Sequence, residues 1–287
     1  MTDVAVTADQ IARAVEDIAK RRPAYRPLLD YYGRMFAAQA AARQRIQLPP
    51  PVVTEEETAQ RRQNGFALLG LSDFTVDIKG CIALLRELCA ILAATRPESA
   101  AAAIALATEI ESGERDAAAL FRAVLEETDA VVADAAEKTG LAADLLAALL
   151  YQSMEPSLQH ISSQAAALLP ADTPPHTAHC PVCGSDPVIS AIAADGNRTL
   201  LCGFCWHRWP VRRVACPHCG DAAAGNREYL YDPAEKEYRV DVCKICRRYM
   251  KTVDLRQITR PFYPPLEQVA TLHLDMLAKE KGFITGP

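Results

Sequence analysis

The sequence predicts an α+β fold, with an N-terminal all-α helical domain, two tandem small β modules that each hold a metal ion, and a C-terminal helix. Three observations support this prediction. Apolar residues recur at helical spacing through the first 170 residues. Eight of the ten cysteines then lie between Cys180 and Cys246, in four Cys-x-x-Cys pairs. Within each module, a segment typical of a strand, a turn and a second strand separates the two pairs.

The helical domain is rich in Ala, Leu, Glu and Arg, and Ile11, Val15 and Ile18 share one helix face. Thr7 or Asp9 can cap this first helix, which Arg22-Pro23 ends. Pro49 to Pro51 lack backbone donors and predict an extended loop. The further helices are predicted over residues 24–47, 55–69, 78–95, 97–112, 116–137 and 142–169, the last with a break at Pro156 as an alternative.

A proline-rich stretch, 170–175, marks the boundary with the cysteine-rich part. Beyond it, the hairpins PVISAIAADGNRTLLC and REYLYDPAEKEYRVDVC follow the same plan, which indicates an internal duplication of about 36 to 41 residues. A strand over 249–255 and a helix over 266–281 complete the chain. We therefore divide it into a helical domain (1–170), a first module (171–212), a second module (213–262) and a C-terminal helix with its tail (263–287).

The four cysteine pairs predict two metal sites. One tight Cys-x-x-Cys turn presents two thiolates to one ion, and two turns complete a tetrahedral four-sulfur shell. The gap between pairs is 18 residues in the first module and 23 in the second. The predicted ligands are Cys180, Cys183, Cys202 and Cys205 in the first site, and Cys216, Cys219, Cys243 and Cys246 in the second.

The spacing leaves the metal open between zinc, which would make the sites structural, and iron, which would add one-electron chemistry. A disulfide framework is the alternative to metal. It is disfavoured because the charged N-terminus has no signal-peptide core, so we expect a cytoplasmic, reducing environment. Cys81 and Cys89 are expected to be buried apolar residues of a helix. His179, His207 and His218 lie near the cysteines, but eight thiolates already fill two sites, so we expect surface or supporting roles.

Charge differs between the two parts of the chain. Residues 1–175 carry 16 Lys and Arg against 24 Asp and Glu, a net of −8, whereas residues 176–261 carry 13 against 9, a net of +4. The basic residues form two stretches, which are Arg208, Arg212 and Arg213 with Trp206 and Trp209, and Lys244, Arg247, Arg248 and Lys251. Ribbons decorated in this way can bind nucleic acid or a protein, but the overall charge of −5 argues against nucleic acid. No catalytic motif is present and no apolar run is long enough to span a membrane, so we predict neither an enzyme nor membrane insertion.

Four segments carry a resemblance to a known family, the FdhE-type formate dehydrogenase accessory (formation) proteins. They are HCPVCGSDPV from His179, LLCGFCWHRWPVRRVACPHCG from Leu200, VCKICRRYMKTVD from Val242 and LDMLAKEKGF from Leu274. Arg247 departs from the pattern, because a glycine is expected after the fourth pair.

The resemblance implies a cytoplasmic protein that assists the maturation of respiratory formate dehydrogenase and binds its catalytic subunit before export by the twin-arginine route. It also implies rubredoxin-like or zinc-ribbon modules, with the eight cysteines as ligands and iron favoured over zinc. Two alternatives remain, a rubredoxin-like iron redox protein and a zinc-ribbon nucleic-acid binder. The oligomeric state is open between a monomer and a homodimer.

Overall fold

The computed structural model describes residues 6–169 and 178–286, so the predicted boundary at 170–175 lies outside the described residues. The chain forms two compact units, one of residues 1–52 and 69–164 and one of residues 53–68 and 165–287. The segment 53–68 therefore belongs to the cysteine-rich unit, although it lies within the helical part of the sequence. The four-part division by residue number stays a prediction, since the two units follow contacts in space and not chain order.

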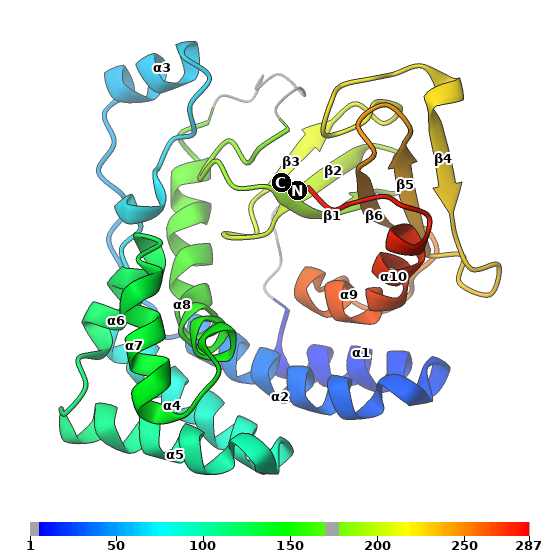
Figure 1. Cartoon of the computed structure of the whole chain (residues 1–287). Coiled ribbons are helices and arrows are strands. Elements are labelled where there is room, and N and C mark those ends of the chain that lie inside the picture. The colour runs from blue at the N-terminus through cyan, green and yellow to red at the C-terminus, as the bar shows by residue number, and fades with distance from the viewer. Residues whose placement is uncertain (1–5, 170–177, 287) are drawn as a thin grey trace. The chain divides into compact units, whose positions relative to one another are not determined.

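The first unit is helical and follows the predicted order closely (Figure 1). Thr7 caps the first helix through its side chain, which accepts the Gln10 backbone N–H at 3.3 Å. The helices are α1 (Ala8–Arg21), α2 (Arg26–Arg43), α4 (Ile78–Thr95), α5 (Pro97–Ser112), α6 (Ala117–Leu125), α7 (Asp129–Thr139) and α8 (Ala143–Ala166), with short 3-10 turns η1 (Pro23–Tyr25) and η2 (Leu71–Asp73).

The structure decides two of the helix predictions in this unit. The single helix predicted over 116–137 is wrong, because Glu127 adopts a left-handed conformation (φ 53°) and separates α6 from α7. The alternative break at Pro156 is not present, since α8 continues through this residue. Cys81 and Cys89 lie on α4 and are buried, as predicted.

The second unit is built on one six-stranded sheet with strand order β3-β2-β1-β6-β5-β4. The strands are β1 (Pro187–Ile192), β2 (Arg198–Cys202), β3 (Arg208–Val211), β4 (Arg227–Leu230), β5 (Tyr238–Cys243) and β6 (Tyr249–Asp254). Each module contributes an antiparallel three-stranded meander, and the two meanders join through the parallel pair β1–β6, with Ser190 opposite Thr252. The duplication is therefore visible as two copies of one meander that follow each other along a single sheet.

Helices complete this unit. The predicted C-terminal helix is present as two helices, α9 (Pro264–Ala270) and α10 (Leu272–Glu280), because Thr271 between them leaves the helical conformation (φ −110°, ψ 16°). Both lie beside the sheet (Figure 1). Asp275 of α10 binds two residues of β6, accepting from Lys251 Nζ at 2.7 Å and from the Tyr249 hydroxyl at 2.9 Å. The unit also contains α3 (Glu55–Gln63) and the turn η3 (Ala224–Asn226).

The fold class predicted from the sequence is confirmed: a helical N-terminal region, two four-cysteine β modules and C-terminal helices. No helix within the described residues is long and apolar enough to cross a membrane.

Candidate metal centres

The four Cys-x-x-Cys turns share one backbone arrangement. In each turn, the N–H of the first cysteine donates to the carbonyl of the second residue after the second cysteine. These bonds are Cys180 to Ser185 at 2.9 Å, Cys202 to His207 at 3.0 Å, Cys216 to Asp221 at 2.7 Å and Cys243 to Arg248 at 3.0 Å. The repeated bond closes each turn and directs both cysteine side chains to the same side.

The residue after each pair is left-handed. The four residues are Gly184 (φ 79°), Trp206 (φ 57°), Gly220 (φ 75°) and Arg247 (φ 59°). Glycine adopts this conformation without steric cost, whereas other residues do so only when the surroundings enforce it. The second and fourth turns, which looked less regular in sequence, therefore have the same geometry as the first and third.

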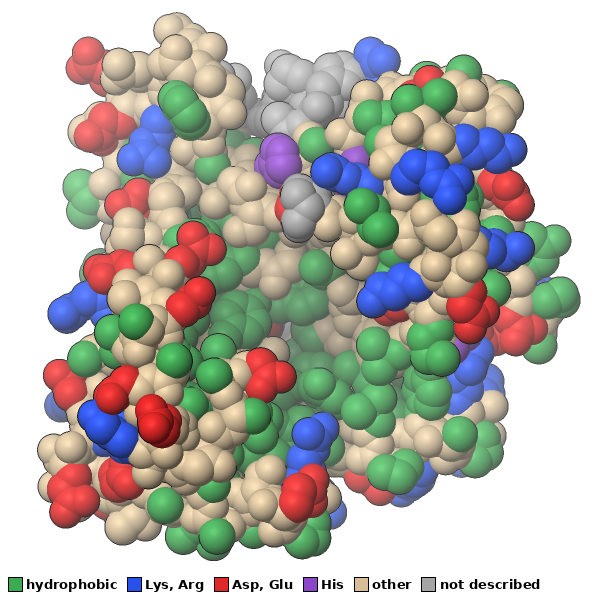
Figure 2. All heavy atoms as spheres, in the orientation of Figure 1, with side chains coloured by type: hydrophobic (Ala, Val, Ile, Leu, Met, Phe, Trp, Pro, Cys, Tyr) green, Lys and Arg blue, Asp and Glu red, His purple; other side chains and the backbone are tan. Residues whose placement is uncertain are grey.

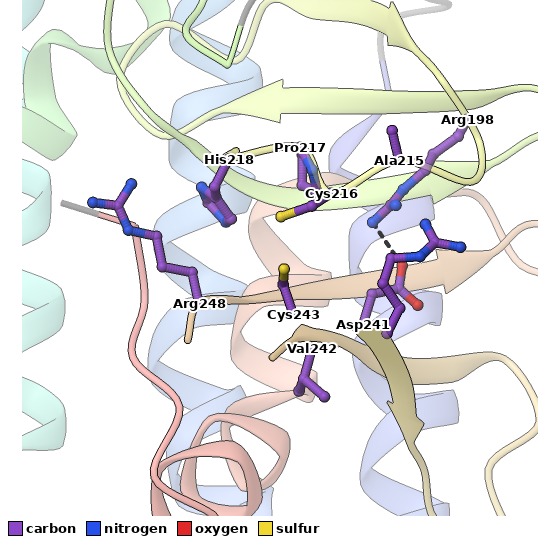
Figure 3. A pocket seen from close by; sticks show the side chains of 10 residues that line it. Arg198, Ala215, Cys216, Pro217, His218, Asp241, Val242, Cys243 and Arg248 are labelled. Atoms are coloured by element: carbon purple, nitrogen blue, oxygen red, sulfur yellow. Dashed lines mark ion pairs between the residues drawn. The ribbon is translucent and has the colours of Figure 1, made fainter. Parts of the chain in front are cut away.

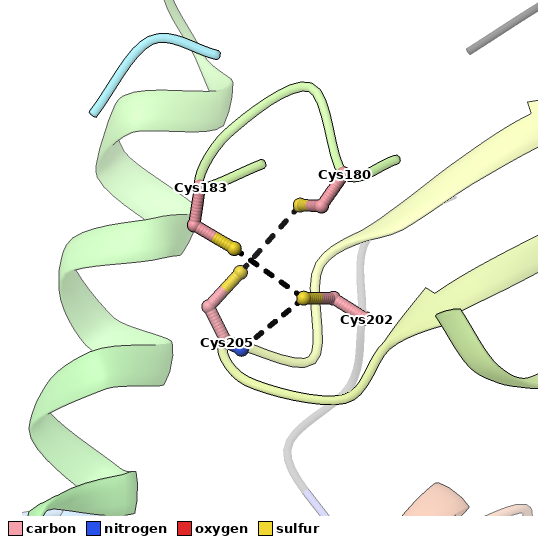
Figure 4. Close-up of side chains that lie close together, drawn as sticks. All are labelled: Cys180, Cys183, Cys202 and Cys205. Carbon is pink, nitrogen blue, oxygen red and sulfur yellow. Dashed lines mark hydrogen bonds between the residues drawn. The ribbon is translucent and has the colours of Figure 1, made fainter. Parts of the chain in front are cut away.

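The first cluster brings together the four cysteines predicted for it (Figure 4). Cys180 Sγ lies 3.7 Å from Cys205 Sγ, and Cys183 Sγ lies 3.4 Å from Cys202 Sγ. The backbone N–H groups of Phe204 and Cys205 donate to Cys202 Sγ at 3.3 and 3.4 Å. Such donors stabilise negative charge on the sulfur and favour the thiolate form.

The second cluster has matching geometry. Cys216 Sγ lies 3.7 Å from Cys246 Sγ, and Cys219 Sγ lies 3.7 Å from Cys243 Sγ. The backbone amides of the turn favour the thiolate form of Cys216 and of Cys243, because an amide dipole next to a sulfur stabilises its negative charge.

These dimensions suit a metal ion and not disulfides. Within each cluster, all four sulfurs lie within 4.8 Å of one another, and all eight cysteines are free. A tetrahedral ion with metal–sulfur bonds of about 2.3 Å would separate the sulfurs by about 3.8 Å, whereas a disulfide needs about 2.05 Å. Burial raises the pKa of the Cys180 and Cys216 thiols, and a bound cation would offset this cost by stabilising their thiolates. Each cluster can therefore hold one metal ion.

The three histidines stay outside both clusters, as predicted. His179 Nδ1 lies 2.9 Å from an Asp186 carboxylate oxygen, His207 stacks on Trp209, and His218 Nε2 donates to the Tyr249 carbonyl at 3.3 Å. Burial lowers the pKa of His218, which keeps this imidazole neutral.

One basic residue of the two basic stretches is buried and therefore does not contribute to the surface. Lys251 is 4% exposed and forms its ion pair with Asp275, so it is a structural residue between β6 and α10. Arg208 lies over the Phe262 ring and Arg247 over the Phe283 ring, at 5.3 and 4.4 Å. On the face shown in Figure 2, Lys and Arg side chains nevertheless gather over the strands of the cysteine-rich unit, and Asp and Glu over the helices of the other unit.

A buried polar network beside the second cluster was missed by sequence reasoning. Arg198 of β2 is 2% exposed and pairs with Asp241 of β5 at 2.6 Å. Its guanidinium also donates to the hydroxyls of Ser190 and Thr252, at 3.1 and 3.3 Å. The network crosses four strands and ties the first meander to the second. Only the strand order, which no local pattern encodes, brings these residues together.

The network borders a small, partly open pocket next to the second cluster (Figure 3). Cys216 and Cys243 form part of its wall, and the segment Ala215, Pro217 and His218 forms another part. Three arginines line the pocket against a single carboxylate, that of Asp241. The arginines are Arg198, Arg227 and Arg248.

Together these features define a class of protein, in which a helical unit accompanies two four-cysteine centres carried on one sheet. The family described as "FdhE, central domain" matches residues 179–213. A "Protein FdhE homolog" from Aquifex aeolicus (strain VF5) is 36% identical over 110 residues, which cover 37% of this chain and 38% of that protein. A homolog of the same name from Haemophilus ducreyi is 35% identical over 109 residues, which cover 37% of this chain and 35% of that protein.

The fold similarity extends further along the chain. The crystal structure of the FdhE protein from Pseudomonas aeruginosa superimposes with a TM-score of 0.62 and 21% sequence identity, covering 99% of this chain and 95% of that chain. The sequence alignments, in contrast, span little more than a third of the curated relatives. The resemblance to the FdhE-type proteins, predicted from the cysteine pairs and their flanking residues, is confirmed.

Proposed function

We propose that this chain is an accessory protein for the maturation of respiratory formate dehydrogenase. It acts in the cytoplasm and binds the catalytic subunit before export, through a surface that the two metal centres hold in shape. The observation that carries this proposal is the similarity to FdhE homologs, which includes the first cysteine pairs, together with a shared fold along nearly the whole chain. In this role the protein binds a partner and catalyses no reaction of its own.

We further propose that all eight clustered cysteines are metal ligands and that each chain holds two ions, iron or zinc. Closed sulfur shells suit a binding protein because each ion contributes folding free energy to a module with a small core of its own. The turn amides and the shared sheet then fix the sulfur positions. Zinc would supply structure alone, and iron would also supply one-electron chemistry.

The functional test replaces one ligand in each centre. In a host that lacks its own copy of the gene, Cys202→Ser and Cys243→Ser should each lower active formate dehydrogenase at least tenfold while its transcript stays constant, because a three-sulfur site binds metal poorly. Cys89→Ser is the matched control, since it removes a buried thiol outside both clusters and should retain most of the activity. Full activity with soluble Cys202→Ser and Cys243→Ser proteins would refute the proposed role of the centres.

The metal itself is identified by analysis of protein purified without oxygen. Iron in both centres should give about two irons per chain and visible charge-transfer bands that bleach on reduction. That result would support a redox contribution to maturation, the alternative favoured by the exposure of Cys219 in the second cluster. About two zincs and a colourless protein would contradict the redox alternative and leave partner binding as the function.

A further inference from the structure

The two centres differ in exposure, although their sulfur geometry is the same. In the first cluster all four cysteines are buried, with exposed fractions between 0% and 6%. In the second cluster Cys216 and Cys243 are buried, Cys246 is partly exposed and Cys219 is exposed. An exposed sulfur is the point at which solvent and other ligands can reach a bound ion.

The difference arises from the segment 53–68, which is distant in sequence but contacts the first centre. The N–H of Leu68 donates to the carbonyl of Pro181, inside the first Cys-x-x-Cys turn, at 3.1 Å. The neighbouring Ala67 lies against Gly184, so that a Cβ added there would meet the Ala67 side chain at 3.5 Å. The equivalent position of the second centre, Gly220, has no atom within 4 Å of an added Cβ. The first centre is covered at this turn and the second is open.

The arginine-lined pocket also borders the second centre, through Cys216 and Cys243. Arg198 is paired with Asp241, but Arg227 keeps a buried Nε without a hydrogen-bond partner among the described residues. A divalent ion with four thiolates carries a net charge of −2, which repels anions. The surplus of positive charge in the pocket offsets this repulsion and attracts an incoming anionic donor.

We infer that the second centre is the exchange site of the protein, where Cys219 yields its place on the ion to an anionic donor, and that the first centre is closed. This inference rests on the metal binding proposed above. In the exchange, the bond between the ion and Cys219 Sγ breaks as the bond to the incoming thiolate or carboxylate forms. Cys219 leaves with the electron pair of the broken bond, so one anionic ligand replaces another and no electron is transferred. The donors that fit are anionic groups such as a cysteine thiolate of a partner protein.

The site of release can be mapped on the chain without any substitution. Metal-loaded chain is treated with EDTA until one equivalent of metal has left, then alkylated with iodoacetamide and analysed by peptide mass spectrometry. We expect two phases of release that differ at least tenfold in rate, with label at Cys216, Cys219, Cys243 and Cys246. Cys81 and Cys89 serve as internal controls and should stay unlabelled, because burial raises their pKa to about 12.

Equal release rates, or label at Cys180, Cys183, Cys202 and Cys205 after the first equivalent, would overturn the inference while leaving the proposed metal binding intact. A chain that neither contains nor takes up metal would overturn both. The two failures are therefore distinguishable by the metal content measured before EDTA is added.

The role of the pocket is tested with two chelators of different charge. Arg227→Gln should slow release by anionic EDTA about threefold and leave release by neutral phenanthroline unchanged, because only the anion responds to the lost charge. Arg213→Gln is the matched control, since Arg213 lies against Gly196 in the hairpin turn of the first module and does not line the pocket. An equal change with both chelators, or the same change in Arg213→Gln, would contradict attraction by the pocket.

Discussion

Arg247 illustrates how a non-glycine residue can hold the left-handed position after a cysteine pair. The conformation costs roughly 1–2 kcal/mol in a residue with a side chain. Here the guanidinium lies over the Phe283 ring at 4.4 Å and donates to the Gly282 carbonyl at 3.0 Å, while the Arg247 carbonyl accepts the N–H of Ile284 at 2.9 Å. These contacts attach the C-terminal segment to the fourth turn, so the arginine that departs from the expected glycine has a structural role.

Gly220 allows the cost of the turn conformation to be measured alone. It is left-handed (φ +75°) and a Cβ added there would meet no atom, so Gly220→Ala changes only the backbone preference. We expect the metal-loaded protein to lose about 1–2 kcal/mol in free energy of unfolding, measured by denaturant titration. Gly225→Ala is the control, because Gly225 also lies in open space but has no left-handed φ, and its effect should stay within about 0.5 kcal/mol or be stabilising. A similar loss in both variants would show that the left-handed conformation is not the cause.

At the scale of the element, the six-stranded sheet joins the two cysteine modules into one unit. The parallel pairing of β1 with β6 joins residues 190–192 to residues 252–254. The ion pair between Arg198 and Asp241 links the first meander to the second. It lies on the face of β6 that bears Thr252, whereas Lys251 and Tyr249 are on the opposite face. A buried pair of this kind contributes little net stability, but breaking it leaves an uncompensated charge. It therefore favours this one alignment of the meanders over alternatives.

The elements that could be predicted from the sequence are those whose cause is local. A cysteine pair needs only four successive positions and one left-handed residue after them, so all eight cysteines were assigned to the clusters in which the structure places them. Helices with a capping residue or a proline at their start, such as α1, α4 and α5, were also predicted closely.

Features that depend on distant segments were not predictable in this way. No glycine or proline at Glu127 indicates that the helix ends there. The burial of Lys251 depends on its ion pair with Asp275, which lies on a separate helix. The cover over the first centre comes from Leu68, more than a hundred residues before the turn it contacts. Local patterns thus identified the members of the two cysteine clusters but not the difference in exposure between the clusters.

At the scale of the whole molecule, the division into two units has a thermodynamic consequence. All eight predicted ligands lie in the second unit, and so do both tryptophans, Trp206 and Trp209. The long helices lie mainly in the first unit. Tryptophan fluorescence therefore reports on the cysteine-rich unit, whereas far-UV circular dichroism reports mainly on the helical unit.

Removal of both metals should separate these two signals in thermal unfolding. We expect the midpoint of the fluorescence transition to fall by at least about 10 °C, because each ion contributes folding free energy to the unit that binds it. In the metal-free protein, ionised cysteines of one cluster would also repel one another. The helical midpoint should change little, since the described residues of that unit contribute no cysteine to either cluster. Chelator saturated with metal beforehand is the control and should shift neither midpoint. If both signals instead move together by the same amount, the two units unfold as one cooperative block, and the metals stabilise the helical unit as well as the sheet that holds them.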